Sequence, residues 1–439
     1  ISKARGVISS FNRNTFDKYF SITRIGQGSI GGKARGLAFL DSLIKRNNLY
    51  TYFDKVEISI PKTVVIGTDI FDEFMDQNKL YSIALSDDYT DDEILARFLE
   101  SGFPEHANED IYKIASSIET PLAIRSSSLL EDSHYQPFAG IYNTYMLPFR
   151  AGNHEVMFNM MRNAIKAVYA SAYYADSKAY MQATSNVIDE EKMAIVIQEV
   201  VGSTYGERFY PTISGVGRSI DYYPLEPAVP EDGTVSLALG LGKYVVDGGQ
   251  SLRFCPRYPK NVLQTSNPEM ALQETQKHFF ALDLSNHDYI IKPNDGACLL
   301  KLRIKEAEKD DSIRGIASTF IMHDNVIRDG YNYKGKKLIT FSNILKHSTL
   351  PLAEILDRVL KLGEEEMGNP VEIEFALDLN VRLGEKVSFK LLQIRPVASK
   401  DESVVIDEEE LDNADALIVS KSALGNGIID NIFDIVYIR

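Results

Sequence analysis

The chain has 439 residues, with 47 lysines and arginines against 62 aspartates and glutamates, and a formal net charge of −15. This length predicts two or three folded units, and so acidic a balance argues against a surface that binds nucleic acid or an anionic membrane. Two cysteines, Cys255 and Cys298, are too few for a disulfide framework, and no apolar run approaches the roughly 18 residues of a membrane span. We therefore expect a reducing compartment, with the cytoplasm as the default location.

The first predicted unit is a strand at 20–25, a glycine-rich turn and a helix at 34–47. The turn contains Gly26, Gly28 and Gly31. Their spacing fits a dinucleotide-binding loop, whereas Ala34 after Lys33 does not fit a Walker A loop. Glycines would let backbone amides approach a polyphosphate, and Lys33 would add a charge at the start of the helix. A glycine-rich turn with a solvated lysine is the structural alternative.

The next segment alternates over 56–68 and carries Pro61, which predicts a strand near a sheet edge. A helix is expected over 69–77, and residues 83–120 are predicted to be mainly helical and peripheral. A longer helix is predicted at 155–182, with an apolar stripe that is typical of a core.

A buried strand within 121–128 ends in Arg125 and three serines. This arrangement would bring a guanidinium and several hydroxyls out at a strand end, which suits a phosphate. The alternative is an arginine paired with Glu131 or Asp132. Both interpretations stay open on the sequence of this segment alone.

From about 190–200 the chain becomes richer in strands and glycine, which predicts a boundary between two lobes. A helix is expected at 352–362, strands at 371–378 and 388–395, and a solvated acidic linker at 401–415. The predicted organisation is an N-terminal extension (1–18), an N-terminal lobe (19–192), a C-terminal lobe (193–398) and a linker with the start of a further domain (399–439).

The two late strands gather acidic, amide and basic side chains. Period-two alternation over 371–378 puts Glu372 and Glu374 on one face, and Gln393 and Arg395 share a parity in the next strand. Paired as a hairpin, the strands would bring a carboxylate, an amide oxygen and a guanidinium to one spot. Oxygen ligands beside a cation suit a magnesium–nucleotide site; the alternative is the solvent-facing side of an amphipathic hairpin.

These groups together indicate a magnesium–nucleotide site, and they belong to a longer ordered series of motifs. The series comprises Gly31-Gly32-Lys33, Ile60-Pro61, Ile124-Arg125-Ser126-Ser127, Glu131-Asp132, Phe138-Ala139-Gly140, Thr144, Ile197-Gln198, Ser214-Gly215-Val216, Gly240-Leu241-Gly242, Glu372-Ile373-Glu374-Phe375 and Leu392-Gln393-Ile394-Arg395-Pro396. Over residues 20–398 the chain resembles the nucleotide-binding part of the pyruvate phosphate dikinase and phosphoenolpyruvate synthase family. The resemblance implies an α+β ATP-grasp fold of two lobes, with the nucleotide site in the cleft between them.

The resemblance also implies a role for individual residues. Lys33 and Arg125 would hold phosphates, Gly140 and Thr144 would belong to a loop over them, Gln198, Glu199 and Val201 would form the hinge at adenine, Glu374 and Gln393 would hold Mg²⁺, and Arg395 would face the γ-phosphate. Ala34 and Lys243 depart from the family pattern, as does the long connection between Glu374 and Gln393. These departures bear on loop geometry and substrate more than on nucleotide binding.

In that family, the ATP-grasp part phosphorylates a histidine on a separate swivelling domain, as in phosphoenolpyruvate synthesis from pyruvate. No histidine here lies in a segment resembling that acceptor loop, and the chain opens on Ile1 rather than methionine. We therefore expect the ATP-binding half of a larger phosphotransferase, whose acceptor domain belongs to the same full-length polypeptide. The alternatives are an ATP-responsive regulatory domain, a dinucleotide-dependent oxidoreductase, and a phosphotransferase acting on a sugar, glucan or drug.

Overall fold

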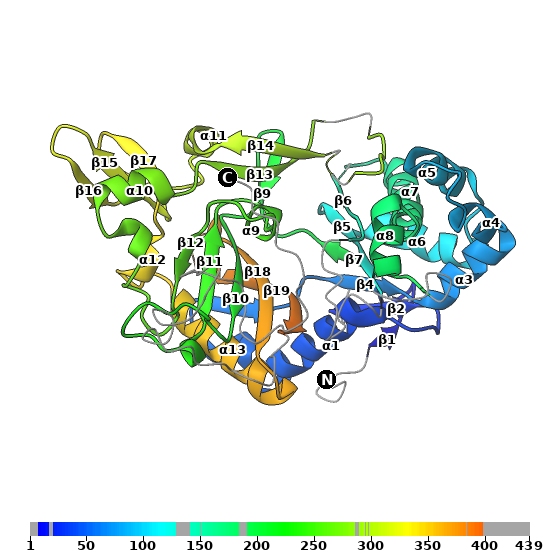
Figure 1. Cartoon of the computed structure of the whole chain (residues 1–439), viewed down its shortest axis with the longest axis horizontal. Coiled ribbons are helices and arrows are strands. Elements are labelled where there is room, and N and C mark those ends of the chain that lie inside the picture. Colours follow the sequence, from blue (N-terminus) through cyan, green and yellow to red (C-terminus); the bar gives the residue numbers. More distant parts are fainter. Residues whose placement is uncertain are drawn as a thin grey trace, which may run out of the picture.

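The computed structural model describes most of the chain and has a mixed α+β fold, as the sequence predicts. The described residues are 8–16, 21–128, 141–149, 151–183, 191–285, 289–294, 296, 298–382 and 384–397. Sheets and covering helices form an elongated molecule (Figure 1). No helix in this described part is both long enough and apolar enough to cross a membrane.

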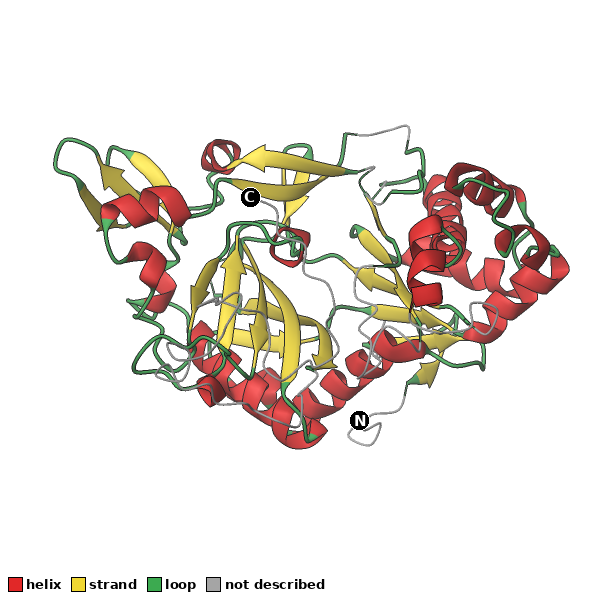
Figure 2. Ribbon diagram, in the orientation of Figure 1, coloured by secondary structure: helices red, strands yellow, loops and turns green. Residues whose placement is uncertain are grey.

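The first sheet is covered by a group of helices, seen at the right of Figure 2. Its strands in spatial order are β1 (Ser9–Ser10), β2 (Ile22–Ile25), β4 (Thr63–Ile66), β7 (Ala194–Glu199), β5 (Leu122–Ser127) and β6 (Thr144–Leu147). The helices are α3 (Thr68–Gln77), α4 (Tyr81–Ala84), α5 (Asp91–Glu100), α6 (Glu105–Ser117), α7 (His154–Ser171) and α8 (Ala175–Ala183). Helix residues such as Phe71 and Phe98 form one apolar core with Ile124 and Ile197 of the sheet.

The second sheet lies above α1 and α13 in Figure 1. Its strands in spatial order are β12 (Leu252–Phe254), β11 (Thr234–Ala238), β10 (Ile213–Arg218), β18 (Val371–Asp378), β19 (Val387–Pro396) and β3 (Val56–Ser59). The helices beside it are α1 (Gly31–Arg46), α2 (Leu49–Tyr52) and α13 (Leu352–Met367). Leu37 of α1 and Leu356 of α13 share a core with Ile373 and Phe389, so this face of the sheet is buried and the opposite face is left for polar side chains.

Two smaller sheets complete the described part. The third consists of β14 (Leu299–Arg303), β13 (His278–Asp283), β9 (Arg208–Tyr210) and β8 (Ser203–Tyr205), and the fourth of β16 (Val326–Asp329), β15 (Ala317–Ile321) and β17 (Lys336–Ile339). The remaining elements are α9 (Lys243–Val246), α10 (Pro268–Glu274), α11 (Ile304–Lys309), α12 (Ser342–Leu345) and the 3₁₀ turns Pro230–Asp232 and Leu263–Thr265. The third sheet is joined to the first by a short connection, because β8 begins at Ser203, shortly after β7 ends at Glu199.

Two predicted elements are divided in the structure. The strand expected over 56–68 is two strands, β3 and β4, which belong to different sheets and are separated at Pro61. The helix expected over 155–182 is α7 followed by α8. At the break the Ser177 hydroxyl donates to the Ser171 carbonyl at 2.7 Å, so a side chain satisfies a carbonyl that a continuous helix would use.

The sheets interleave the two predicted lobes. β3 comes from the segment assigned to the N-terminal lobe, yet it pairs in parallel with β19, Phe389 standing opposite Ile58. Conversely, β7 lies beyond residue 192 but pairs with β4 and β5 of the first sheet. The first and second sheets are therefore each built from both segments of the chain. The domain limits at 19–192 and 193–398 stay a proposal.

Candidate active site

A cavity of about 520 Å³ lies where the first and second sheets face each other. It is lined by every described member of the expected set: Lys33, Arg125, Thr144, Gln198, Glu199, Val201, Glu374, Gln393 and Arg395. Gly140 lies outside the described residues. The volume is in the range that small-molecule sites in proteins occupy.

Arg125 lines this cavity, and its side chain is 14% exposed. Nη1 donates to Oε1 of Gln198 at 3.3 Å and to the Leu392 carbonyl at 3.4 Å. Nη2 donates to Oε1 of Gln393 at 2.6 Å and lies 3.6 Å from Oε2 of Glu374. The alternative partners Glu131 and Asp132 lie outside the described residues. The guanidinium therefore links hinge and hairpin residues, separated by nearly two hundred positions in the sequence.

The hairpin expected near the C-terminal end is β18 and β19, and Glu374 stands opposite Gln393 in its register. The register shifts directly after this pair, so that Phe375 stands opposite Leu391 and Leu392 is the extra residue of a bulge. Strict alternation would put Leu391 on the same face as Gln393. The bulge instead buries Leu391 in the core and leaves Gln393 at the cavity.

Lys33 lies in the first turn of α1, and its Nζ donates to the Ser126 hydroxyl at 3.0 Å. The serines that follow Arg125 hold the start of this helix. The Ser128 carbonyl accepts from the Gly32 amide at 2.9 Å, and the Ser127 hydroxyl accepts from the Ala34 amide at 3.1 Å. The first-turn amides named here are thus bound by the protein, and Lys33 reaches the cavity through its side chain.

The glycine loop before α1 binds a side chain, which corrects the expectation that its amides face a polyphosphate. Asp69 accepts from the amides of Gln27 at 2.8 Å and Gly28 at 2.9 Å. A Cβ atom at Gly26 would lie 2.5 Å from Asp69, so the glycine is needed for this approach. The loop is therefore a structural turn around Asp69. For the glycines this agrees with the structural alternative, a glycine-rich turn.

The predicted hinge continues from β7 into the segment before β8. Gln198 is buried, and the amide of Glu199 donates to the Lys62 carbonyl at 3.1 Å. Burial raises the pKa of Glu199, and the ammonium groups of Lys62 and Lys390 oppose this shift. Val201, two residues further on, also lines the cavity. The segment can present backbone groups and one carboxylate to a ligand at this end.

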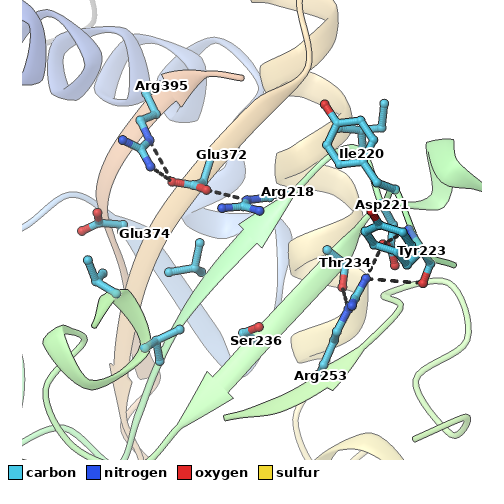
Figure 3. Close-up of a pocket in the computed structure, with 14 residues that line it drawn as sticks. Arg218, Ile220, Asp221, Tyr223, Thr234, Ser236, Arg253, Glu372, Glu374 and Arg395 are labelled. Atoms are coloured by element: carbon cyan, nitrogen blue, oxygen red, sulfur yellow. Dashed lines mark hydrogen bonds and ion pairs between the residues drawn. The ribbon is translucent and has the colours of Figure 1, made fainter. Parts of the chain in front are cut away.

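A second cavity, of about 300 Å³, continues from the first over the polar face of the second sheet. The two cavities share Val246, Glu374 and Arg395. Arg253 occupies its other end, where Nε donates to Thr234 at 3.0 Å and Nη2 contacts Asp221 (Figure 3).

Glu372 lies under the second cavity between two arginines (Figure 3). Arg395 contacts its Oε1 through Nε at 2.8 Å and Nη2 at 2.5 Å, and Arg218 donates from Nε to Oε2 at 2.6 Å. Alternation in the sequence predicted that Glu372 shares a face with Glu374, but no role was predicted for Glu372. No role was predicted for Arg218. The alternation of Val216 and Arg218, opposite Glu374 and Glu372, was the available signal.

A divalent cation would find two neighbouring oxygen ligands at Glu374 and Gln393. Within the described residues there is no group of three histidine, cysteine, aspartate or glutamate side chains that could hold a metal unaided. Mg²⁺ commonly takes one or two protein oxygens and completes its shell with phosphates and water. The residues therefore fit a cation that arrives with a polyphosphate.

Comparisons with known proteins found a matching family and a distant relative. The family described as "Pyruvate phosphate dikinase, AMP/ATP-binding domain" matches residues 27–415. The uncharacterized phosphotransferase YvkC of Bacillus subtilis (strain 168) is 21% identical over 355 residues, which make up 80% of this chain and 33% of that protein. The chain thus spans one third of the length of that relative.

Proposed function

Since the chain belongs to the AMP/ATP-binding domain family of pyruvate phosphate dikinase, we propose that it binds ATP with Mg²⁺ and passes a phosphoryl group to a histidine on a separate swivelling domain. The observation that carries this proposal is the convergence on one cavity of all described residues expected to bind nucleotide. Membership of an AMP/ATP-binding domain family supports ATP binding. The metal, the acceptor and the individual roles are proposals.

The contacts of Arg125 support one direction for a nucleotide in the first cavity. Gln198, Glu199 and Val201 line the first cavity alone, and Arg395 lies where this cavity meets the second. Arg125 links the hinge to the hairpin through Gln198 and Gln393. We place adenine at the hinge, the phosphates along Lys33 and Arg125, and the terminal phosphate at Arg395.

Phosphoryl transfer needs positioning and charge neutralisation more than covalent help from the protein. Lys33, Arg125 and Arg395 would supply positive charge, each with a side chain that lines the cavity. Glu374 and Gln393 would hold Mg²⁺, which when bound neutralises charge that develops on the phosphate oxygens. Closure of the two facing sheets around the nucleotide would exclude water that could otherwise accept the phosphoryl group.

The lining of the second cavity favours a phosphoryl acceptor that is nucleophilic without a general base. Each carboxylate lining it lies beside an arginine: Asp221 beside Arg253, Glu372 beside Arg218 and Arg395, and Glu374 beside Arg125. A hydroxyl acceptor needs a general base within hydrogen-bond reach, and these carboxylates are already engaged by arginine side chains. A neutral imidazole carries its lone pair at physiological pH. This chemistry favours histidine over a sugar, glucan or drug hydroxyl.

The test is phosphoryl transfer from γ-labelled ATP, measured with this chain alone and with a longer natural protein that contains it. We expect magnesium-dependent ATP binding by the chain, slow or no turnover alone, and acid-labile label on a histidine outside residues 1–439 in the longer protein. Stable label within the chain, or the same steady-state rate in both samples, would contradict the acceptor assignment. Binding of NAD in place of ATP would contradict the site itself.

A further inference from the structure

One buried carboxylate is shared by two arginines across three adjacent strands. Glu372 of β18 stands opposite Arg218 on one side and Arg395 on the other. Its side chain is 6% exposed, and each of its oxygens accepts from a different guanidinium. A carboxylate can accept several hydrogen bonds, so both arginines are held by the same anion.

The two arginines differ in what else they face. Arg395 lines both cavities, whereas Arg218 lines the second cavity alone. Glu372 is the partner that the described residues provide for Arg218, whose side chain is 47% exposed. The structure therefore gives Arg218 a contact to the carboxylate that holds Arg395, and no contact to the nucleotide end of the first cavity.

We propose that Arg218 is a positioning residue that keeps Arg395 available for the terminal phosphate of ATP, an inference that rests on the function proposed above. Glu372 paired with Arg395 alone would form a neutral pair, in which the carboxylate compensates the guanidinium. A second arginine on the same carboxylate leaves the group with one net positive charge. In a partly desolvated site this excess charge attracts a phosphate more strongly than it would in water.

The position of this group predicts which ligands it affects. Arg395 lies where the first cavity meets the second, whereas the hinge residues line the first cavity alone. AMP bound with its adenine at the hinge would have no terminal phosphate to place at Arg395. Loss of Arg218 should therefore weaken ATP binding and leave AMP binding nearly unchanged. The ratio of the two affinities separates this role from a general loosening of the fold.

Arg253 is a matched control in the same cavity. Its side chain is 46% exposed, close to that of Arg218, and it also contacts a buried carboxylate, Asp221. It lies on β12, three strands away from β18 and Glu372, whereas Arg218 lies on the adjacent strand β10. Removing its charge changes the net charge of the cavity equally but leaves the shared carboxylate intact.

The experiment measures dissociation constants for magnesium–ATP and for AMP by calorimetry in the wild type and in Arg218→Met, Arg218→Lys and Arg253→Met. We expect Arg218→Met to raise the ATP constant about fivefold or more relative to the AMP constant. Arg218→Lys should keep most of the ratio, because a lysine retains the charge beside Glu372. Arg253→Met should change the ratio less than about twofold.

A double variant tests whether Arg218 acts through Arg395. In an Arg395→Met background, Arg218→Met should no longer change the ATP to AMP ratio. An unchanged ratio in the single variant, an equal effect of Arg253→Met, or a persisting effect in the Arg395→Met background would overturn the proposal. Failure of the wild type to bind ATP would instead contradict the proposed function, so the two failures are distinguishable.

Discussion

Arg125 donates a 2.6 Å hydrogen bond to the amide oxygen of Gln393, and this contact joins β5 of the first sheet to β19 of the second. The oxygen that Arg125 engages is the one proposed for Mg²⁺. An amide oxygen has two lone pairs, so it can accept from Arg125 and still offer a ligand position. The same residues thus hold the two sheets together and define where phosphates would enter.

The Arg125→Ala variant should bind ATP more weakly. A charge-assisted hydrogen bond is worth about 1.5–3 kcal/mol, so we expect at least tenfold weaker binding by calorimetry. Arg97→Ala is the control, because Arg97 is exposed on α5 and pairs at 3.7 Å with Glu100. Equal ATP affinities in the two variants would contradict the assignment of Arg125 to the nucleotide site.

The Glu374→Gln variant should lose most of the magnesium dependence of ATP binding. The substitution keeps the shape of the side chain but replaces a carboxylate ligand by a neutral amide. Titrations with and without Mg²⁺ measure the effect, and Glu365→Gln on the exposed face of α13 is the control. A magnesium dependence that survives in Glu374→Gln would place the metal elsewhere.

The Gly31→Ala variant should destabilise the fold at the start of α1. Gly31 has φ +68° and an added Cβ would lie 1.7 Å from the Ser127 carbonyl oxygen, so strain and overlap combine to roughly 2–5 kcal/mol. Gly152 has φ +72° with nothing within 4 Å. Gly152→Ala should therefore cost about 1–2 kcal/mol in urea denaturation. Similar losses in both variants would show that the close approach carries no extra free energy.

Lys166 should make a contribution to stability that rises with pH above about 8. Its Nζ is buried in α7 and donates to the Leu99 and Ser101 carbonyls at 2.9 and 2.5 Å. Burial, with the charge of Arg162, lowers the pKa of Lys166 from 10.5 to about 8. Between these values the unfolded chain holds a proton that the folded chain has released, so the free energy of unfolding increases with pH.

The measurement is urea denaturation at about pH 8 and about pH 9.5 for the wild type, Lys166→Met and Lys260→Met. The increase should shrink in Lys166→Met and persist in Lys260→Met, because Lys260 is exposed. Burial also lowers the pKa of Lys277 and Lys390, which acts in the same direction, and raises the pKa of Cys255 and of tyrosines such as Tyr210, which acts in the opposite direction. These contributions are common to all three proteins. An equal increase in all three proteins would contradict the assignment.

The sequence predicted the hairpin of the site well because alternation is a local signal. The strand over 371–378 is found with those bounds, and the carboxylates at Glu372 and Glu374 occur on the polar face. The bulge at Leu392 was not predictable by parity, since it depends on which residues the neighbouring strand buries. Arg218 was missed because its pairing with Glu372 joins positions 154 residues apart.

The glycine loop shows the opposite case, in which a local motif misleads. Gly26 and Gly28 have a spacing that suggests phosphate contact, yet they make room for Asp69, more than forty residues away. Other expectations lie outside the described residues, among them Gly140 and the linker at 401–415. The cytoplasmic location and the further domain remain predictions.

The position of β3 has a consequence for dissecting the chain into fragments. Residues 193–397 alone would lack β3, and β19 would become an open strand edge with unpaired backbone groups over Val387–Lys390. The same fragment would lose α1, whose Leu40 is fully buried in the core around β19. Separate expression of the two pieces on either side of the boundary suggested by composition would therefore leave each with exposed apolar core, and we expect both pieces to aggregate.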